Sequence, residues 1–265
     1  MSPPGGLGVE RDGPLLRLTL DQPGRRNALD DATTAALIAE LEAANQDEAV
    51  RAVVLTGRGD DFCSGFDLAT RDGGATRPRP GSIQRRLPAQ AHRLVVTVCT
   101  VQVPVVAAVR GWAAGIGLHL AVAADFCVAA ADAQFWEPFT ARGFTPDSGG
   151  TWLVPRRVGV TRANELLLLG RKLSGTEAAE WGLVHTAVAT DQVATTADAL
   201  AARLAAGPTV ALGLTKWLLH TGAGLDLERH LANEAFALEL SSRSADFREG
   251  LAALGERREP RFEGR

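Results

Sequence analysis

The chain has 265 residues, 46% of them hydrophobic, and a formal net charge of −3 at pH 7. This length suits one large domain, or one domain with a helical appendage. The small negative charge provides no basic field, and no apolar run approaches the roughly 20 residues that cross a bilayer, so we expect neither nucleic-acid nor membrane partners.

The cysteines and the first residues both indicate a cytoplasmic protein. Cys63, Cys99 and Cys127 show no C-x-x-C spacing and lie in apolar or strand-like contexts. We therefore expect reduced, buried thiols and no metal or redox centre. Residues 1–6 lack the basic region and apolar run of a secretory signal, so we expect a frayed terminus there.

Four segments are predicted to be strands, and helical segments separate them. Residues 15–20 (Leu-Leu-Arg-Leu-Thr-Leu) alternate well enough for a strand, and turn residues follow them. Residues 51–57, 103–109 and 125–130 are short apolar runs, which are typical of buried parallel strands. The alternation of strand and helix favours an α/β fold with right-handed crossovers.

Asn27 is predicted to cap the helix that follows the first of these strands. The apolar stripe of that helix would run through Leu29, Leu37, Ile38 and Leu41. Residues 71–82 are rich in Gly, Pro and Arg, a composition that cannot pack a core, so we expect a mobile loop there. A helix over residues 82–99 is expected to follow this loop.

The last part of the chain has a different character. After about residue 160 it consists of Ala- and Leu-rich helical segments, with breaks at Gly207-Pro208 and at residues 222–224. We therefore expect a core over residues 1–195 and a helical region over residues 196–265. The helical region has more apolar residues than a helical hairpin needs, which indicates a subunit interface. They include Trp217, Leu218, Leu231 and Phe236.

Two glycine-containing loops are candidates for binding a carbonyl oxygen. Residues 62–68 (Phe-Cys-Ser-Gly-Phe-Asp-Leu) contain small residues, which let a ligand approach backbone N–H groups. Residues 110–117 form a turn into a helix, whose first N–H groups are unpaired. One donor from each loop would form an oxyanion hole for a thioester carbonyl. Taken singly, each loop also has a structural explanation, because close packing of a helix on a strand requires glycine.

In this order and spacing, the two loops resemble those of the crotonase family, the enoyl-CoA hydratases and isomerases. The run over residues 146–156 (Pro-Asp-Ser-Gly-Gly-Thr-Trp-Leu-Val-Pro-Arg) looks particularly like the isomerase branch used in aerobic phenylacetate breakdown. The resemblance extends over nearly the whole chain. Its other segments are residues 23–29, 53–68, 104–125, 143–159, 177–184 and 256–262.

The resemblance implies a fold, an assembly and a ligand. The fold would be α/β, with a core of ββα spiral turns and a C-terminal helical trimerisation region in a homotrimer or a dimer of trimers. The ligand would be an acyl-CoA, with coenzyme A as part of the substrate and no metal or redox cofactor. The oxyanion donors would be the N–H groups of Ser64 and Ile116. Ligand contacts would come from Arg26, Ser64, Phe66, Asp67, Leu68 and Gly115, although Asp67 also suits a structural acid that holds the turn.

Two positions depart from the pattern of the family hydratases. Those enzymes use two glutamates, one for the water and one for the proton at the α-carbon, and here the positions hold His119 and Phe139. Phenylalanine cannot transfer a proton, so water addition by two glutamates is not expected. A histidine titrates near neutrality and could do acid–base work, but a hydrogen-bonded core histidine explains His119 equally well. Glu137, two residues before Phe139, is a weaker candidate than Asp147.

Asp147 is the principal catalytic candidate. It precedes Ser148-Gly149-Gly150, at a position where several isomerases of the resembled family carry a single catalytic carboxylate. Moving a double bond between the β,γ and α,β positions requires one base and an oxyanion hole, so the sequence favours an enoyl-CoA isomerase. The alternative role for Asp147 is to cap the following helix.

Other functions remain open. His92 matches, by its distance from Pro104, a histidine that the aroyl-CoA dehalogenases of this family pair with an aspartate, although a plain surface residue is the simpler interpretation. An enoyl-CoA hydratase, or an acyl- or aroyl-CoA hydrolase, would use His119 or His92 with Asp147. A non-catalytic acyl-CoA-binding protein would keep the oxyanion hole without a catalytic acid or base. The arginine cluster over residues 71–93 is either a solvated loop or a contact for the CoA phosphates.

Overall fold

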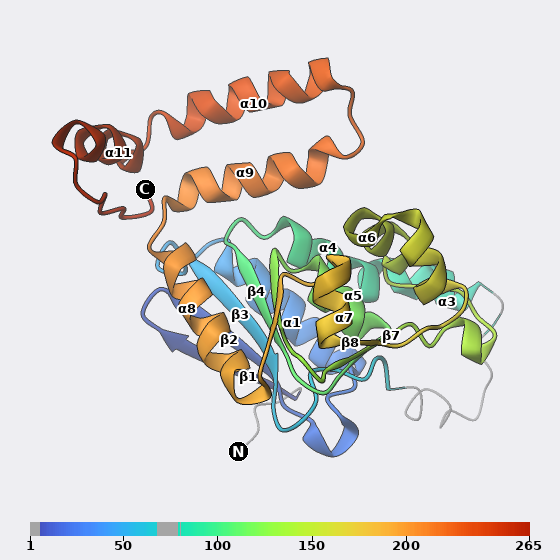
Figure 1. Ribbon diagram of the computed structural model, residues 1–265. Coiled ribbons are helices and arrows are strands. Elements are labelled where there is room, and N and C mark those ends of the chain that lie inside the picture. Colours follow the sequence, from blue (N-terminus) through green and yellow to red (C-terminus); the bar gives the residue numbers. More distant parts are fainter. Residues whose placement is uncertain (1–5, 68–78, 80) are drawn as a thin grey trace.

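The computed structural model describes residues 6–67, 79 and 81–265. In this part of the chain, a six-stranded sheet and a smaller three-stranded sheet form the core, and helices pack around them (Figure 1). The mobile loop predicted over residues 71–82 lies almost entirely outside the described residues. The architecture is the predicted α/β class.

The larger sheet is mostly parallel, as the apolar runs predicted. Its strand order is β1, β2, β3, β4, β6, β9, and only the pair of β1 and β2 is antiparallel. Every residue of β4 is buried, so both faces of the sheet are covered there and the strand shows no alternation. The strands are β1 (Leu7–Asp12), β2 (Leu15–Leu20), β3 (Ala52–Gly57), β4 (Val105–Val109), β6 (Phe126–Ala130) and β9 (Thr186–Val188).

The second sheet connects parallel strands of the first sheet to the helices. β5 (Trp112–Ala114) follows β4 and leads into α5 (Ile116–Ala123), and β7 (Gln134–Trp136) follows β6 in the same way. β7 lies between β5 and β8 (Leu173–Ser174), parallel to the first and antiparallel to the second. Each such unit has one strand in the larger sheet, one strand in the smaller sheet and then a helix. This is the ββα spiral turn that the family resemblance implied.

Asn27 does not cap the first helix, contrary to the prediction. Helix α1 (Asp31–Ala44) has Asp30 as its N-cap, and the Asp30 side chain accepts a hydrogen bond from the first turn. The Asn27 side chain donates instead to the carbonyls of Arg58 and Asp61, at 2.9 and 2.6 Å. Its φ of 55° is left-handed, a conformation that asparagine adopts more readily than most residues. Asn27 therefore ties two loops together.

The predicted helix over residues 82–99 is two helices. α3 (Ser82–Arg86) and α4 (Ala91–Thr100) are separated at Gln90, whose φ of −121° and ψ of −101° are not helical. His92 consequently lies in the first turn of α4.

Helix α8 (Val193–Ala205) packs against β3, β4 and β6 of the larger sheet. The predicted division after residue 195 therefore falls within a single helix that belongs to the core. Two further helices that contribute to the core are α6 (Gly150–Leu167), which kinks at Gly159, and α7 (Gly175–Trp181).

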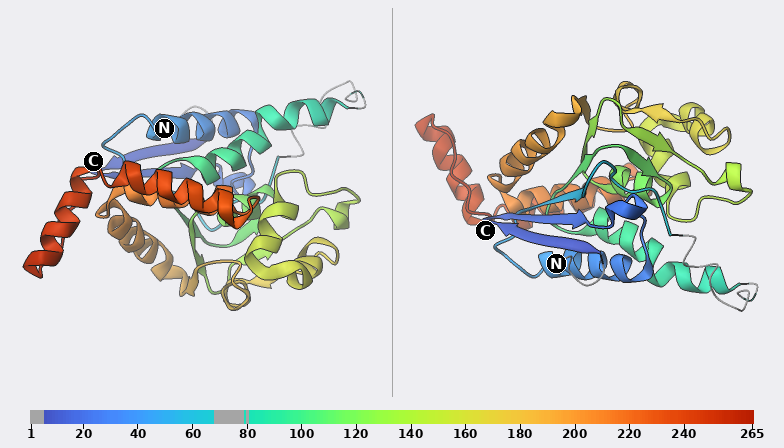
Figure 2. Two further views of the ribbon diagram at one scale, coloured as in Figure 1. Left: turned by 90° about the horizontal axis from the view of Figure 1, so that it is seen from above. Right: turned by 90° about the horizontal axis from the view of Figure 1, so that it is seen from below.

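Three helices form the C-terminal region. α9 (Thr209–Gly222) and α10 (Leu227–Ser241) run antiparallel beside the core, and α11 (Ala245–Glu256) extends to one side (Figures 1 and 2). Their exposed apolar side chains include those of Leu219, Leu227, Leu231, Phe236, Leu238 and Leu254. In the described part of the chain, no helix combines the length and apolar character needed to cross a membrane.

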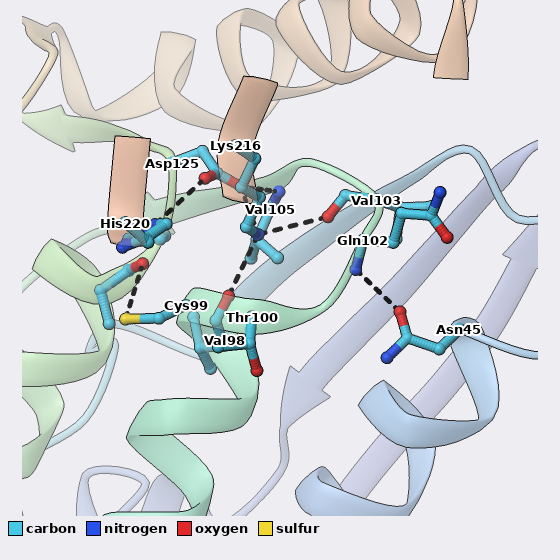
Figure 3. Close-up of polar contacts among 12 residues, drawn as sticks. Asn45, Val98, Cys99, Thr100, Gln102, Val103, Val105, Asp125, Lys216 and His220 are labelled. Carbon is cyan, nitrogen blue, oxygen red and sulfur yellow. Dashed lines mark hydrogen bonds and ion pairs between the residues drawn. The ribbon is translucent and has the colours of Figure 1, made fainter. Parts of the chain in front are cut away.

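A buried lysine fixes α9 to the core (Figure 3). The amine of Lys216 donates to the carbonyls of Val98 and Val103, and it pairs with the Asp125 carboxylate at 2.7 Å. Asp125 also accepts a hydrogen bond from the N–H of Val105, at 2.8 Å. A buried charge is tolerated when it is paired and hydrogen-bonded in this way.

Candidate active site

A small pocket lies between the two glycine-containing loops and the segment before α6. It brings together five of the predicted catalytic or ligand-binding residues: Ser64, Phe66, Gly115, Ile116 and Asp147. Asp147 is the one carboxylate among the described residues of its lining. The other lining residues are Gly65, Pro138, Phe139, Arg142 and Phe144.

Backbone contacts hold the two loops together. Cys63 and Ala113 form a parallel bridge, with hydrogen bonds of 2.8 and 3.0 Å on either side. A side chain at Gly117 would clash with the Cys63 carbonyl, so this approach requires glycine. Ile116, the first residue of α5, consequently lies beside the other loop with its N–H at the unpaired end of the helix.

The prediction that the Ser64 N–H is an oxyanion donor is wrong. That N–H donates to the Arg26 carbonyl at 3.0 Å, which holds the loop against the preceding turn. Phe66 forms a parallel bridge with Leu29, made by the backbone groups of the residues on either side of Phe66. In such a bridge the N–H of Phe66 itself points to the opposite side. Phe66 also lines the pocket, so this part of the loop contributes to the pocket wall.

Two of the other predicted ligand contacts, Arg26 and Asp67, lie outside the described pocket lining. The exposed Arg26 side chain approaches the Asp61 carboxylate at 3.7 Å, and its contact with CoA stays a prediction. Asp67 accepts a hydrogen bond from Arg25 at 2.7 Å, which supports the structural interpretation of this acid. Leu68 lies outside the described residues, as does part of the arginine cluster.

His119 does not line the pocket, contrary to the catalytic interpretation. Its side chain is fully buried, and the Phe139 ring stacks on the imidazole with centroids 5.7 Å apart and planes 4° apart. Phe139 itself lines the pocket and packs edge-on against Phe144. The ring of Phe139 therefore separates the imidazole from the pocket, and the core interpretation of His119 agrees with the structure.

Four polar side chains behind the pocket form a continuous row. Glu137 Oε1 lies 2.9 Å from His119 Nε2, and His119 Nδ1 lies 2.6 Å from Ser148 Oγ. Ser148 Oγ lies 3.2 Å from Oδ1 of Asp147. The first three side chains are buried, and only Asp147 reaches the pocket. Ser148 was not among the site residues predicted from the sequence.

Asp147 does not cap the helix that follows it. Helix α6 has Gly149 as its N-cap, and no side chain accepts a hydrogen bond from its first turn. The carbonyl of Asp147 lies 2.8 Å from Nε2 of His92. A carbonyl can only accept, so this nitrogen is the protonated one in that contact. His92 therefore contacts the backbone of the Asp147 segment rather than the carboxylate.

The cysteines are unsuited to nucleophilic chemistry at neutral pH. Burial raises the pKa of Cys63, which adjoins the pocket, to about 12, and it raises the pKa of Cys127 to about 12 as well. Cys99 is half-buried. The predicted burial is confirmed for Cys63 and Cys127, and the nucleophile of a cysteine site is the thiolate, which neither forms readily.

A larger cleft of about 480 Å³ lies between α6 and α9. Its polar lining includes Asp125, Lys216 and His220 (Figure 3). None of the residues predicted to be catalytic or ligand-binding lines it. Its buried amine is already bonded to three acceptors, so the smaller pocket at Asp147 is the stronger candidate for chemistry.

The sequence and the fold are both similar to those of proteins that are named as enoyl-CoA hydratases or as a CoA-thioester isomerase. The chain is 39% identical over 254 residues to a 1,2-epoxyphenylacetyl-CoA isomerase of Escherichia coli, covering 95% of each chain. It is 42% identical over 248 residues to a probable enoyl-CoA hydratase of Rhodobacter capsulatus, covering 94% of each. The crystal structure of an enoyl-CoA hydratase from Bacillus anthracis superposes with a TM-score of 0.91 at 31% identity, over 98% of this chain and 100% of that one.

These similarities confirm the resemblance to the crotonase family and to its phenylacetate-type isomerases. The family model described as enoyl-CoA hydratase/isomerase matches residues 10–265, almost the whole chain. The protein therefore belongs to the enoyl-CoA hydratase/isomerase family, within the crotonase superfamily.

Proposed function

We propose that the protein is an enoyl-CoA isomerase, which moves a double bond of an acyl-CoA thioester between the β,γ and α,β positions. The observation that carries this proposal is that Asp147 is the one carboxylate in the described pocket lining, which it shares with residues of the two glycine-containing loops. The similarity to an isomerase of Escherichia coli supports the same reaction type. One carboxyl group opposite backbone donors suits a reaction in which a single proton is removed and returned.

Asp147 acts first as a base and then as an acid in this mechanism. Its carboxylate removes a proton from the α-carbon of a 3-enoyl thioester, and the electrons of that C–H bond pass into a dienolate. Backbone N–H groups at the pocket, that of Ile116 among them, hold the negative oxygen of the dienolate. Protonated Asp147 then returns the proton to the γ-carbon, and the double bond forms between the α- and β-carbons as the carbonyl is restored. Neither water nor a redox partner is consumed.

A hydratase or hydrolase is the second candidate. It is favoured by the contact between His92 and the Asp147 segment, and by the hydratase names of several relatives. However, the His92 nitrogen nearest Asp147 donates to a carbonyl, so it is not placed to take a proton from water. Phe139 occupies the position of the second family glutamate and offers no group for activating water.

The substitution Asp147→Asn tests the proposal against both alternatives. We expect kcat for a 3-enoyl-CoA to fall about 10²- to 10⁴-fold, because the base is lost. Affinity for a saturated acyl-CoA, measured by calorimetry, should change little, since the amide keeps the shape of the carboxylate. Asp12→Asn, a change of an exposed acid at the end of β1, is the matched control and should leave kcat unchanged.

The outcomes separate the three functions. Full isomerase activity of the Asp147→Asn variant would contradict our mechanism. A wild-type protein that hydrates or hydrolyses the substrate, without moving its double bond, would favour the second candidate. A wild-type protein that binds acyl-CoA but turns over no enoyl-CoA would be a non-catalytic binder.

We also propose that the protein works as a homotrimer or a dimer of trimers. The exposed apolar side chains of α9 to α11 support this, because Leu227, Phe236 and Leu254 are 72, 60 and 76% exposed. Sedimentation velocity should give a mass of three or six chains for the wild type. Phe236→Glu should shift the protein toward smaller species, and a monomeric wild type would contradict the proposal.

A further inference from the structure

The buried row behind Asp147 contains more polar groups than packing alone requires. Glu137, His119 and Ser148 are 1, 0 and 1% exposed. Oε2 of Glu137 has no hydrogen-bond partner among the described residues. Burying a carboxyl group with an unpaired oxygen costs free energy, and an apolar residue at this position would avoid that cost. An incompletely satisfied buried acid beside a catalytic pocket requires an explanation.

We propose that Glu137, His119 and Ser148 are positioning residues that store one proton and thereby turn the Ser148 hydroxyl onto Asp147. This inference rests on the proposed function, in which Asp147 is the base. The row touches the pocket only through Asp147, so its effect on the substrate passes through that carboxylate. Its members hold the reacting group in place and do not themselves react.

The proton count of the row supports this role. Its three contacts, between Glu137 and His119, His119 and Ser148, and Ser148 and Asp147, need three hydrogens. A neutral imidazole and a hydroxyl supply only two. With both acids ionised, one contact therefore lacks a hydrogen, and a third proton on the Glu137–His119 pair completes the row.

The stored proton determines which way the Ser148 hydroxyl points. When the Glu137–His119 pair holds it, His119 Nδ1 carries a hydrogen and donates to Ser148 Oγ at 2.6 Å. The Ser148 O–H then donates to Oδ1 of Asp147, which leaves Oδ2 for the substrate proton. Without the stored proton, Nδ1 accepts from Ser148, and the hydroxyl is turned away from Asp147. The pair is net neutral when it holds the proton, which suits its buried site.

Burial argues against a direct nucleophilic role for Ser148. A serine, histidine and acid in hydrogen-bond contact could form a hydrolytic triad. However, Ser148 does not belong to the described lining of the pocket, and Phe139 covers the imidazole. A thioester carbonyl in the pocket would meet Asp147 rather than the Ser148 hydroxyl.

Nuclear magnetic resonance provides a test that does not depend on activity. The chain has five histidines, so ¹⁵N labelling of histidine gives few signals, and a His119→Gln variant assigns the one of interest. We expect Nδ1 of His119 to show the shift of a protonated nitrogen at neutral pH in the wild type. A shift typical of an unprotonated nitrogen at Nδ1 would overturn the proposal.

Kinetics of Ser148→Ala provide the second test. We expect kcat for a 3-enoyl-CoA to fall about tenfold to a hundredfold, the usual effect of losing a hydrogen bond to a charged group. The dissociation constant of a saturated acyl-CoA should stay the same, and Ser148→Thr, which keeps the hydroxyl, should restore most of the rate. In an Asp147→Asn background, Ser148→Ala should have no further effect, because the row acts through Asp147.

Each result has one meaning. If Asp147→Asn is fully active, the proposed function fails, whatever the row does. If Asp147→Asn is inactive but Ser148→Ala keeps the wild-type kcat, Asp147 is still supported as the base and the stored-proton proposal is wrong. Equal losses of kcat and ligand affinity in Ser148→Ala would also overturn it, because they indicate general damage. Should Ser148→Ala fail to fold, the protonation of His119 Nδ1 in the wild type still tests the proposal, and an unprotonated nitrogen there would contradict it.

Discussion

Two buried ionisable clusters in the described part of the chain differ in how completely their polar groups are hydrogen-bonded. The amine of Lys216 has two carbonyls and the Asp125 carboxylate as acceptors, and it fixes α9 to the core. The row from Glu137 through His119 ends on Asp147 at the pocket, and one oxygen of Glu137 lacks a partner among the described residues. The satisfied cluster suits a structural role, and the incompletely satisfied one suits a functional role.

Lys216→Met should give the largest effect on stability. The substitution leaves the Asp125 carboxylate without its cation and two carbonyls without their donor. We expect the free energy of unfolding to fall by about 3 kcal/mol, near the lower end for breaking a buried pair, because the Asp125 side chain is 16% exposed. Urea denaturation would measure this change, and kcat of the folded variant should stay near the wild-type value.

Lys172→Met is the matched control for this comparison. Lys172 is exposed over the rings of Trp112 and Trp136, with its amine 5.3 and 4.8 Å from their centroids. Its loss should cost less than about 1 kcal/mol, the value of an exposed cation–π contact. Equal destabilisation by the two substitutions would show that the Lys216 cluster is not a special anchor.

Gly150→Ala should perturb the other cluster. A Cβ at Gly150 would clash with the His119 ring and come close to Glu137, and neither buried side chain has open space beside it. We expect kcat to fall about tenfold, by analogy with loss of one hydrogen bond to a charged group, and stability to fall by about 1 kcal/mol from overpacking. Steady-state kinetics and urea denaturation would measure the two effects.

Gly255→Ala separates this effect from the general consequence of replacing a helical glycine. Gly255 lies in α11, and a Cβ there would meet open space. Such a change usually stabilises a protein by about 0.5 kcal/mol, because it restricts the unfolded chain. If Gly150→Ala behaved in the same way, with unchanged kcat, the geometry of the row would not matter for catalysis.

Much of the fold was predictable because its signals are local. The runs that became β3, β4 and β6 are short and apolar, which a strand covered on both faces requires. The short strands β5, β7, β8 and β9 have two to three residues each, too few for a recognisable pattern. The helix cap was misplaced because Asn27 and Asp30 are both favoured cap residues, and only the left-handed backbone of Asn27 decides between them.

The site was predictable where the backbone forms it and less so where side chains meet across the fold. Asp147 and the two loops follow from motifs, but the link from Asp147 through Ser148 to His119 joins residues on different elements. A usable signal existed, since His119 and Glu137 both lie in apolar segments and a buried polar side chain requires a partner. Pairing these two residues would have explained His119 without placing it in the pocket.

The smallest effect is expected for the reactivity of two thiols, Cys63 and Cys99. Burial raises the pKa of Cys63 to about 12, whereas the pKa of Cys99 rises only to about 11, because Cys99 is less completely buried and the charge of Lys216 partly offsets its burial. At pH 9 both groups are mostly protonated, and one unit of pKa makes the Cys99 thiolate about tenfold more abundant. Iodoacetamide labelling followed by peptide mapping should therefore modify Cys99 about tenfold faster than Cys63. In Lys216→Met the offsetting charge is gone, so Cys99 should react more slowly; an unchanged rate would show that the Lys216 charge does not reach this thiol.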